Sequence, residues 1–320
     1  MKTRISIALA TCNGSRHLAT LLDSLTAQTQ LPDELVALDD ASTDDTVAIL
    51  EAFSTTAPFP VRILSNPQRL GVSENFSRAI AQCRGDSIAL ADQDDVWRPD
   101  KLARLAAALM PSNVLAAFSD ADVVDAELAP LGYTMWQRVR LTPDELQRLE
   151  NSQGFGVLLK HHIVTGATLA FRTALRDSAL PIPPDWPHDA WLALIAAAQG
   201  QLVPLRQALV AYRQHDGNVV GGRRKPLRHQ IREALKVDRG RWYGEELARW
   251  HALAARLEQC TTPGGIGTAL AGKIAHLEAR AQLPAPRWRR LPGILNELHR
   301  GRYAHYARNW GSIALDLLIK

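Results

Sequence analysis

Three carboxylates stand close together at Asp92, Asp94 and Asp95, directly after the apolar run Ile88 to Ala91. An apolar run that ends in acids is typical of a buried strand whose carboxyl end opens into a loop. Crowded carboxylates repel one another and raise each other's pKa unless a cation lies between them. Oxygen ligands of this kind suit a hard divalent metal. The sequence therefore predicts a site for Mg²⁺ or Mn²⁺ here.

Elements that could position these acids come from a repeated pattern in the first third of the chain. Apolar runs predict strands at 5–10, 35–38, 61–64 and 88–91, and helical periodicity follows at 17–28, 44–53, 72–81 and 100–109. Consecutive strand and helix units predict an α/β fold with a Rossmann-like, mostly parallel sheet and helices on both faces. Ligands of such sheets bind beyond the carboxyl ends of the strands. Thr11, Asp39 and Asp40 should converge there with the acidic cluster.

Asp39 and Asp40 end the second expected strand. A carboxylate only accepts hydrogen bonds, so these residues can receive the imide N–H of a uracil or thymine ring. The next residues, Ser42 to Asp45, are better explained as the start of a helix, because Ser, Thr and Asp favour helix N-termini.

Further polar residues follow expected strands at 114–118, 163–171 and 202–211. Asp189 precedes an amphipathic helix and is, from the residues alone, either its N-cap or a functional acid. Gly166 could permit a sugar to approach the backbone. His215 is a good third ligand for a metal already held by acids, and Arg213 can bind a diphosphate through two hydrogen bonds.

Four segments resemble, in the same order, the motifs of the family 2 glycosyltransferases of the GT-A fold, most of all the bacterial rhamnosyltransferase-like branch. They are Ala-Thr-Cys-Asn-Gly at 10–14, Leu-Asp-Asp-Ala-Ser-Thr-Asp-Asp-Thr at 38–46, Asn-Pro-Gln-Arg-Leu-Gly at 66–71 and Ala-Asp-Gln-Asp-Asp-Val-Trp at 91–97. The resemblance covers residues 3 to 220, roughly two thirds of the chain.

The resemblance assigns roles to the site residues. It implies that Thr11, Asp39 and Asp40 hold the nucleotide base, that Arg69 lines the nucleotide pocket, and that Asp92 lies near the ribose and metal. It also implies that Asp94, Asp95 and His215 lie at the metal and diphosphate, and that Asp189 is the general base. Ala190 stands where the family usually has an aromatic residue, which puts the acceptor contacts in question.

The resemblance also implies a reaction. The donor would be a nucleotide diphosphate sugar, with dTDP-L-rhamnose the best guess and a UDP-sugar the alternative. One sugar would be transferred with inversion of configuration at its anomeric carbon. The acceptor would be a hydroxyl of a saccharide or lipid-linked saccharide in cell-surface polysaccharide biosynthesis. The Gln-x-x-Arg-Trp motif of processive synthases is absent from the sequence, which favours single-sugar addition.

Charge divides the chain. Residues 221–320 contain 19 Lys and Arg against 8 Asp and Glu, whereas residues 1–220 contain 18 against 25. We expect a GT-A catalytic domain at 1–220 and a basic, mainly helical region at 221–320.

The basic region could make peripheral contact with an anionic membrane, because it combines cations with aromatic side chains. The residues that fit such contact are Arg223-Arg224-Lys225, Arg287-Trp288-Arg289-Arg290 and the tryptophans at 242, 250 and 310. The other interpretation is a helical cap packed on the main domain. Nucleic-acid binding is not expected, because no recognised motif accompanies the charge.

Composition excludes several classes. The chain has 46% hydrophobic and 22% charged residues, which argues against disorder. Its three cysteines show no metal or disulfide pattern. Neither a signal peptide nor a membrane span is expected, so we expect a cytoplasmic protein, at the inner face of the cytoplasmic membrane if the tail binds lipid.

Two alternatives remain open. A sugar-nucleotide nucleotidyltransferase would also need acids, metal and an α/β sheet, although residues 11–16 lack its Gly-rich basic loop. A non-catalytic sugar-nucleotide- or membrane-binding module would be favoured if Asp189 lay far from the metal site.

Overall fold

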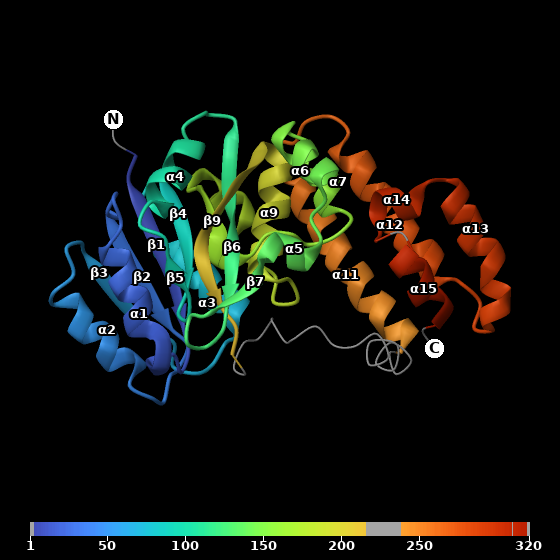
Figure 1. Ribbon diagram of the computed structural model, residues 1–320. Helices are drawn as coiled ribbons and strands as arrows, with labels where there is room; N and C mark the ends of the chain where they lie inside the picture. Colours follow the sequence, from blue (N-terminus) through green and yellow to red (C-terminus); the bar gives the residue numbers. More distant parts are fainter. Residues whose placement is uncertain (1–2, 216–237, 309, 319–320) are drawn as a thin grey trace. The chain divides into compact units, whose positions relative to one another are not determined.

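The computed structural model describes residues 3–215, 238–308 and 310–318 (Figure 1). The chain forms two compact units. We call Met1–Gly154 with Ile163–Gly217 the sheet unit, and Phe155–His162 with Asn218–Lys320 the helical unit. The predicted boundary at 220/221 and the cluster Arg223-Arg224-Lys225 lie outside the described residues, so both stay predictions.

The sheet unit is built on one mixed sheet. Its strands are β1 Ile5–Thr11, β2 Glu34–Asp39, β3 Val61–Ser65, β4 Ser87–Asp92, β5 Val96–Trp97, β6 Val114–Val124, β7 Pro130–Thr134, β8 Leu169–Arg172 and β9 Gln201–Arg213. Their spatial order is β3-β2-β1-β4-β8-β6-β9-β5, with β7 beside β6. The first four strands of this order run parallel, as do β6 and β9. Strand β8 is antiparallel to both its neighbours.

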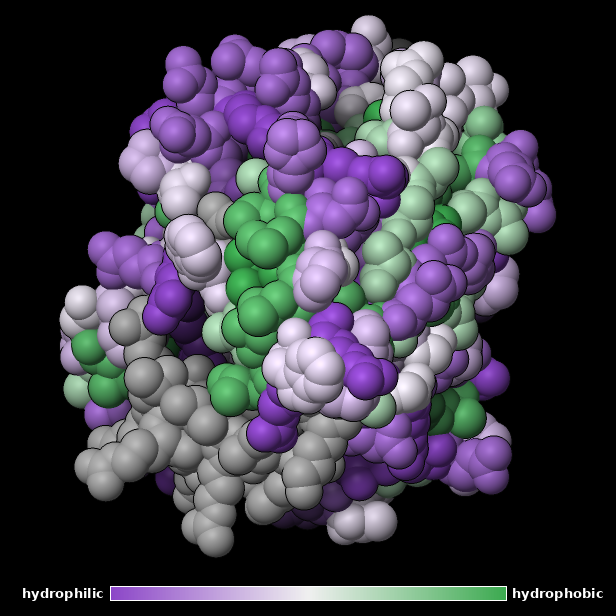
Figure 2. Space-filling view, turned by 90° about the vertical axis from the view of Figure 1, so that its right-hand side faces the viewer, coloured by the Kyte–Doolittle hydropathy of each residue, from purple (hydrophilic) through white to green (hydrophobic). Residues whose placement is uncertain are grey.

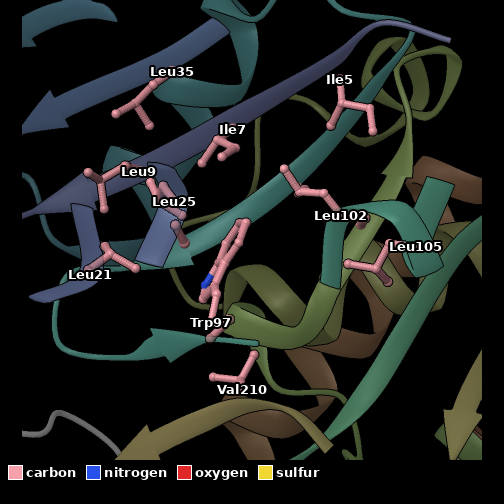
Figure 3. Packing of buried hydrophobic residues seen from close by; sticks show 14 of the residues in the cluster. Ile5, Ile7, Leu9, Leu21, Leu25, Leu35, Trp97, Leu102, Leu105 and Val210 are labelled. Carbon is pink, nitrogen blue, oxygen red and sulfur yellow. The ribbon is translucent and has the colours of Figure 1, made fainter. Parts of the chain in front are cut away.

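Helices lie on both faces of this sheet, as predicted. They are α1 Ser15–Thr26, α2 Thr46–Ser54, α3 Val72–Gln82, α4 Lys101–Ala108, α5 Met135–Val139, α6 Pro143–Glu150, α8 Ala174–Ala179 and α9 His188–Gln199; α7 Gly154–Leu158 begins in the sheet unit and continues into the helical unit. Alternate residues of a strand face opposite sides. Ile5, Ile7 and Leu9 of β1 therefore share one face, where they pack with α1 and α4 (Figure 3). Helix α3 packs against β1 and β2 and also against α9.

Trp97 anchors the acidic loop to this core. Its side chain is 3% exposed and lies among apolar residues of β1, α1 and α4 (Figure 3). The loop that carries the three acids therefore has a buried strand before it and a buried aromatic side chain after it. Both ends of the loop are held, which fixes where its carboxylates point.

The helical unit consists mainly of α11 Arg239–Glu258, α12 Ile266–Ala281, the 3₁₀ helix η2 Arg287–Arg290, α13 Leu291–His299, α14 Arg302–Tyr306 and α15 Trp310–Leu318. Its apolar core includes Leu283, Ile294 and Tyr303. Trp250 is 6% exposed and lies in this unit's interior, whereas Trp288 and Trp310 are 70% and 73% exposed. Trp250 was thus wrongly grouped with membrane-facing tryptophans. None of the described helices is long and apolar enough to span a membrane.

Candidate functional site

Polar residues gather at the carboxyl edge of the parallel strands. Thr11 pairs in register with Asp39 across β1 and β2, and Ala10 pairs with Asp92 across β1 and β4. The strand ends are therefore level, and Thr11, Asp39 and Asp92 lie at one edge although they are far apart in sequence. This arrangement is the one that the strand and helix pattern predicted.

Asp39 is buried and already bound within this edge. Its Oδ1 accepts the hydroxyl of Thr11 at 2.9 Å, and its Oδ2 accepts the N–H of Ser42 at 2.8 Å. The hydroxyl of Ser42 also donates to Oδ1 at 2.5 Å. These bonds fix the carboxylate, and recognition of a base by Thr11 and Asp39 stays a prediction.

Asp40 organises the loop before α3. Its Oδ1 accepts the N–H of Leu70 and its Oδ2 the N–H of Gly71, both at 2.8 Å. Asn66 donates its side-chain N–H to Oδ1 at 2.9 Å. Gly71 has a φ of +91°, which only glycine adopts readily. The loop therefore depends on Asp40, whose carboxylate is bound internally as that of Asp39 is, and recognition of a base by Asp40 stays a prediction.

Arg69 lies in the same loop. Its guanidinium donates to the sulfur of Cys12 from Nε at 3.1 Å and from a terminal nitrogen at 2.6 Å. Cys12 follows directly after β1, so the loop shaped by Asp40 brings Arg69 to the strand-end edge. The structure thus places Arg69 beside the other predicted nucleotide-binding residues, and its role there stays a prediction.

Two of the three acids, Asp92 and Asp95, have raised pKa values, and neighbouring carboxylates contribute to both shifts. Burial first, and then the charges of Asp94 and Asp189, raise the pKa of Asp92 to about 7. Burial and the charges of Asp94 and Asp92 raise the pKa of Asp95 well above its usual range. The carboxylate of Asp95 is fully buried, and its Oδ2 has no hydrogen-bond partner. The cluster therefore carries a negative charge that protein groups compensate only in part.

Lys101 supplies part of that compensation. Its side chain is fully buried at the start of α4, where Nζ donates to the carbonyl of Ala167 at 2.5 Å and lies 3.1 Å from the ring centre of Trp97. Burial lowers the pKa of Lys101 well below its usual value, and the charges of Asp95 and Asp92 oppose that shift. Lys101 was not among the predicted site residues, although a lysine on the helix face that also carries buried leucines was a usable signal.

The end of β9 is joined to the acidic loop. The N–H of Arg213 donates to Oδ1 of Asp95 at 3.0 Å, and its Nε donates to the carbonyl of Asp94 at 2.7 Å. Nε2 of His215 lies 2.8 Å from Oδ2 of Asp94. The structure thus brings together Arg213, His215 and the acids, as the sequence suggested. Arg213 is 3% exposed and contacts the backbone of the loop, so it positions the loop.

His17 is a second residue that the sequence analysis missed. It lies on α1, and its ring centre is 5.0 Å from that of His215. Burial and then the charges of Arg213 and His215 lower the pKa of His17. An open pocket of about 260 Å³ is lined by Asn13, Gly14, Arg16, His17, Gln93, Asp94 and His215. A neutral imidazole therefore faces the same space as the Asp94 and His215 pair.

Asp189 lies at the other side of the acidic cluster. Pro187 is the N-cap of α9, and Asp189 is in the first turn, so Asp189 is not the cap that one interpretation of the sequence expected. Its Oδ2 accepts the N–H of Gly166 at 3.1 Å. Its charge raises the pKa of Asp92, which places the two carboxylates near each other.

Gly166 accommodates a histidine. A Cβ on Gly166 would lie 2.5 Å from Nε2 of His188, too close for any real side chain. His188 stacks on Phe76 with ring centres 4.0 Å apart. The absence of a side chain at Gly166 thus lets the start of α9 approach the backbone, and approach of a sugar to this backbone stays a prediction.

The comparisons with known proteins agree with this geometry. Residues 6–174, more than half of the chain, match the profile of Glycosyl transferase family 2. The chain belongs to this family. The predicted family resemblance is confirmed, and so is glycosyltransferase as the enzyme class.

A relative from Shigella flexneri, the dTDP-rhamnosyl transferase RfbG, is 25% identical over 258 residues, which cover 75% of this chain and 82% of that protein. A glycosyltransferase from Nostoc sp. is 26% identical over 221 residues, which cover 67% of this chain and 66% of that protein. A protein from Mycobacterium bovis is 27% identical over 265 residues, which cover 79% of this chain and 67% of that protein.

Two solved structures share the fold of this family 2 chain. TarS of S. aureus in complex with UDP-GlcNAc has a TM-score of 0.60 at 16% identity, covering 91% of this chain and 79% of TarS. The mannosyltransferase PcManGT from Pyrobaculum calidifontis, in complex with GDP-Man and Mn²⁺, has a TM-score of 0.53 at 18% identity, covering 93% of this chain and 76% of its own. The predicted GT-A fold is confirmed.

The donor atoms at the acidic loop fit a divalent metal only in part. Among the described residues, no three His, Cys, Asp or Glu side chains are placed together as ligands of one ion, so Asp94, Asp95 and His215 are not gathered into a single set. Asp95 is separated by burial and by its bond to Arg213. Asp94 and His215 do meet, and a carboxylate oxygen with an imidazole nitrogen suits Mn²⁺ or Mg²⁺. The raised pKa of Asp95 shows that its ionised form lacks a countercharge, which a cation beside this pair would supply.

Proposed function

We propose that this chain is an inverting, metal-dependent glycosyltransferase. It moves one sugar from a nucleotide diphosphate sugar to a hydroxyl of a saccharide or lipid-linked saccharide in bacterial cell-surface polysaccharide biosynthesis. One observation carries the proposal: Asp189 accepts the N–H of Gly166 and Asp92 accepts the N–H of the next residue, Ala167, so a candidate base from α9 lies next to the strand-end acids. A module that only bound the donor would have no use for an acid there.

The donor in this proposal is dTDP-L-rhamnose. The support is the similarity to the Shigella protein, whose name is dTDP-rhamnosyl transferase, at 25% identity. A thymine or uracil ring would lie near Thr11 and Asp39, at the edge that the loop containing Arg69 borders. A UDP-sugar is the alternative donor, because both bases present the same imide N–H.

The proposed mechanism gives each of these side chains one role. Asp94 and His215 would hold Mg²⁺ or Mn²⁺, which, when bound, stabilises the negative charge of the leaving diphosphate. Asp189 accepts the proton of the attacking hydroxyl while the new bond forms at the anomeric carbon and the bond to the diphosphate breaks. Because the hydroxyl attacks opposite the leaving group, the configuration at that carbon inverts. The N–H of Gly166 holds the carboxylate of Asp189 in place for this step.

Asp189→Asn tests the proposal. The amide oxygen of Asn can still accept the N–H of Gly166 but cannot take a proton at neutral pH. Turnover should fall about a hundredfold or more, the usual scale for removing a general base. Donor affinity and melting temperature should stay near wild type. The measurements are the rate of sugar transfer and the donor dissociation constant, with dTDP-L-rhamnose and UDP-sugars compared.

Asp185→Asn is the matched control, since Asp185 is exposed and lies four residues earlier in the chain. It should leave the rate of sugar transfer, the donor dissociation constant and the melting temperature unchanged. Near-normal turnover in Asp189→Asn would remove Asp189 from the mechanism. A parallel loss of donor binding would place Asp189 in the nucleotide site instead.

A further inference from the structure

Helix α13 of the helical unit presents apolar side chains to solvent. Leu291, Leu295 and Leu298 are 48%, 59% and 36% exposed. Their spacing of four and then three residues places them on one side of the helix, which we call the leucine face. Ile294 lies on another side of α13, is 3% exposed and belongs to the apolar core of the unit. The helix therefore packs on its unit through one side while the leucine face stays exposed.

Trp288 extends the leucine face into η2. Its side chain is 70% exposed, and it precedes Leu291 by three residues, which is one turn of a 3₁₀ helix. The guanidinium of Arg289 lies 4.8 Å from the centre of the Trp288 ring, within the range of a cation–π contact. Figure 2 shows apolar side chains in green gathered between hydrophilic ones on the side of the molecule that lies at the right of Figure 1. Apolar surface gathered in this way indicates an interaction site.

The exposed charges near the leucine face are positive. Residues 284–320 contain six arginines and one lysine but only two acids, Glu297 and Asp316. Both acids are buried, and both accept hydrogen bonds from arginines of the same unit. The exposed arginines next to α13 and within η2 are Arg287, Arg289 and Arg300. This part of the chain thus presents apolar and basic side chains together.

An anionic bilayer matches both properties of this surface. Its headgroups attract basic residues, and the boundary with its acyl chains accepts leucine and tryptophan side chains. A second copy of this chain matches only the apolar property. Across a two-fold interface it would place the same patch, with the same arginines, against itself, and like charges repel. Charge complementarity therefore favours lipid.

We propose that η2 and α13 dock on an anionic lipid bilayer. Trp288 and the leucine face would enter the boundary between headgroups and acyl chains, and the exposed arginines would contact the headgroups. Arg290 is 1% exposed and Trp250 is 6% exposed, so neither can contribute to the contact that the sequence suggested for them. The surface lies within the helical unit and uses none of the residues assigned to sugar transfer, so the proposal stands apart from the proposed function.

Sedimentation of the full chain with lipid vesicles tests the leucine face. The vesicles contain phosphatidylglycerol and phosphatidylcholine, or phosphatidylcholine alone. The double variant Leu291→Gln with Leu295→Gln should bind the anionic vesicles about tenfold more weakly or worse, because two apolar contacts are lost. The matched control is Met110→Gln with Leu131→Gln, since Met110 and Leu131 are 65% and 41% exposed but belong to the sheet unit. The control should bind like wild type.

A single variant tests the charge. Arg289→Gln should weaken binding to the anionic vesicles about fivefold, the usual contribution of one basic residue near such a surface. Arg84→Gln, at an exposed arginine of the sheet unit, is the control and should bind like wild type. Added NaCl should weaken binding of the wild type, because it screens the attraction between arginines and headgroups.

Melting curves show whether each variant is folded, and sedimentation velocity without lipid gives the oligomeric state. If the wild type does not bind anionic vesicles, or if the two double variants lose binding equally, the proposal is overturned. Equal binding to anionic and neutral vesicles would also overturn it, because the arginines would then have no part in docking. A wild-type dimer that dissociates in the leucine variant would assign the leucine face to a second copy instead of lipid.

Discussion

The two units of this protein treat buried acids in opposite ways. In the sheet unit, burial and the charges of neighbouring carboxylates raise the pKa of both Asp92 and Asp95. In the helical unit, Asp316 is fully buried but receives hydrogen bonds from Arg280, Tyr243 and Tyr303. The first arrangement leaves a negative charge for a ligand to neutralise, whereas the second is complete without one.

The comparison predicts that removing a buried acid lowers stability in the helical unit, whereas removing an acid of the sheet unit weakens ligand binding. The largest stability effect should come from Asp316→Asn, because the substitution leaves the buried Arg280 without a countercharge. Loss of one partner of a buried ion pair costs about 3–5 kcal/mol. Urea unfolding followed by tryptophan fluorescence measures the free energy. Glu258→Gln, at an exposed acid of α11, is the control and should change it by less than about 0.5 kcal/mol.

Asp94→Ala should behave in the opposite way. The charge of Asp94 raises the pKa of both Asp92 and Asp95, so its removal relieves repulsion and should leave stability unchanged or slightly higher. Donor binding that depends on Mn²⁺ should weaken about a hundredfold or more, because Asp94 is one of the two proposed metal ligands. Thermal shift with the donor, with and without Mn²⁺, measures both effects. An Mn²⁺-dependent shift equal to that of wild type would contradict the metal assignment.

A smaller effect concerns a buried cation of the helical unit. Burial lowers the pKa of Lys273 to about 7, with a further decrease from Arg280. The unfolded chain therefore binds more protons than the folded chain between pH 7 and the ordinary lysine value, and linkage makes stability rise with pH across that window. The slope should be up to about 1.4 kcal/mol per pH unit. Lys273→Met should remove it.

The measurement for Lys273 is the difference in unfolding free energy between wild type and Lys273→Met at pH 7, 8 and 9. The difference cancels the titration of groups that both proteins share. If the two proteins showed parallel pH profiles, Lys273 would be charged in the folded chain over the whole range. Its bond to the carbonyl of Tyr306 at 2.7 Å would then suffice to stabilise the charged form.

Much of the sheet unit could be predicted from local pattern. Alternating apolar runs and helical periodicity predicted β1 to β4 with α1 to α4, and parallel strands place their carboxyl ends at one edge. That rule brought Thr11, Asp39 and the acidic cluster together without any knowledge of side-chain contacts. A strand was predicted at 163–171, and β8 forms only at its end, Leu169–Arg172. Its antiparallel place between β4 and β6 was not predicted, because the apolar pattern of a strand does not show which strands lie beside it.

The tertiary structure alone decided which charges meet. Lys101 lies in contact with Trp97 and the carbonyl of Ala167, and Gly166 is in contact with His188. His17 approaches His215 from the opposite end of the sheet unit's sequence. Periodicity shows which face of an element is buried, but it does not show which distant residue lies against that face. Buried charge is stabilised or opposed by its neighbours over a few ångströms, so those neighbours are known only once the chain has folded.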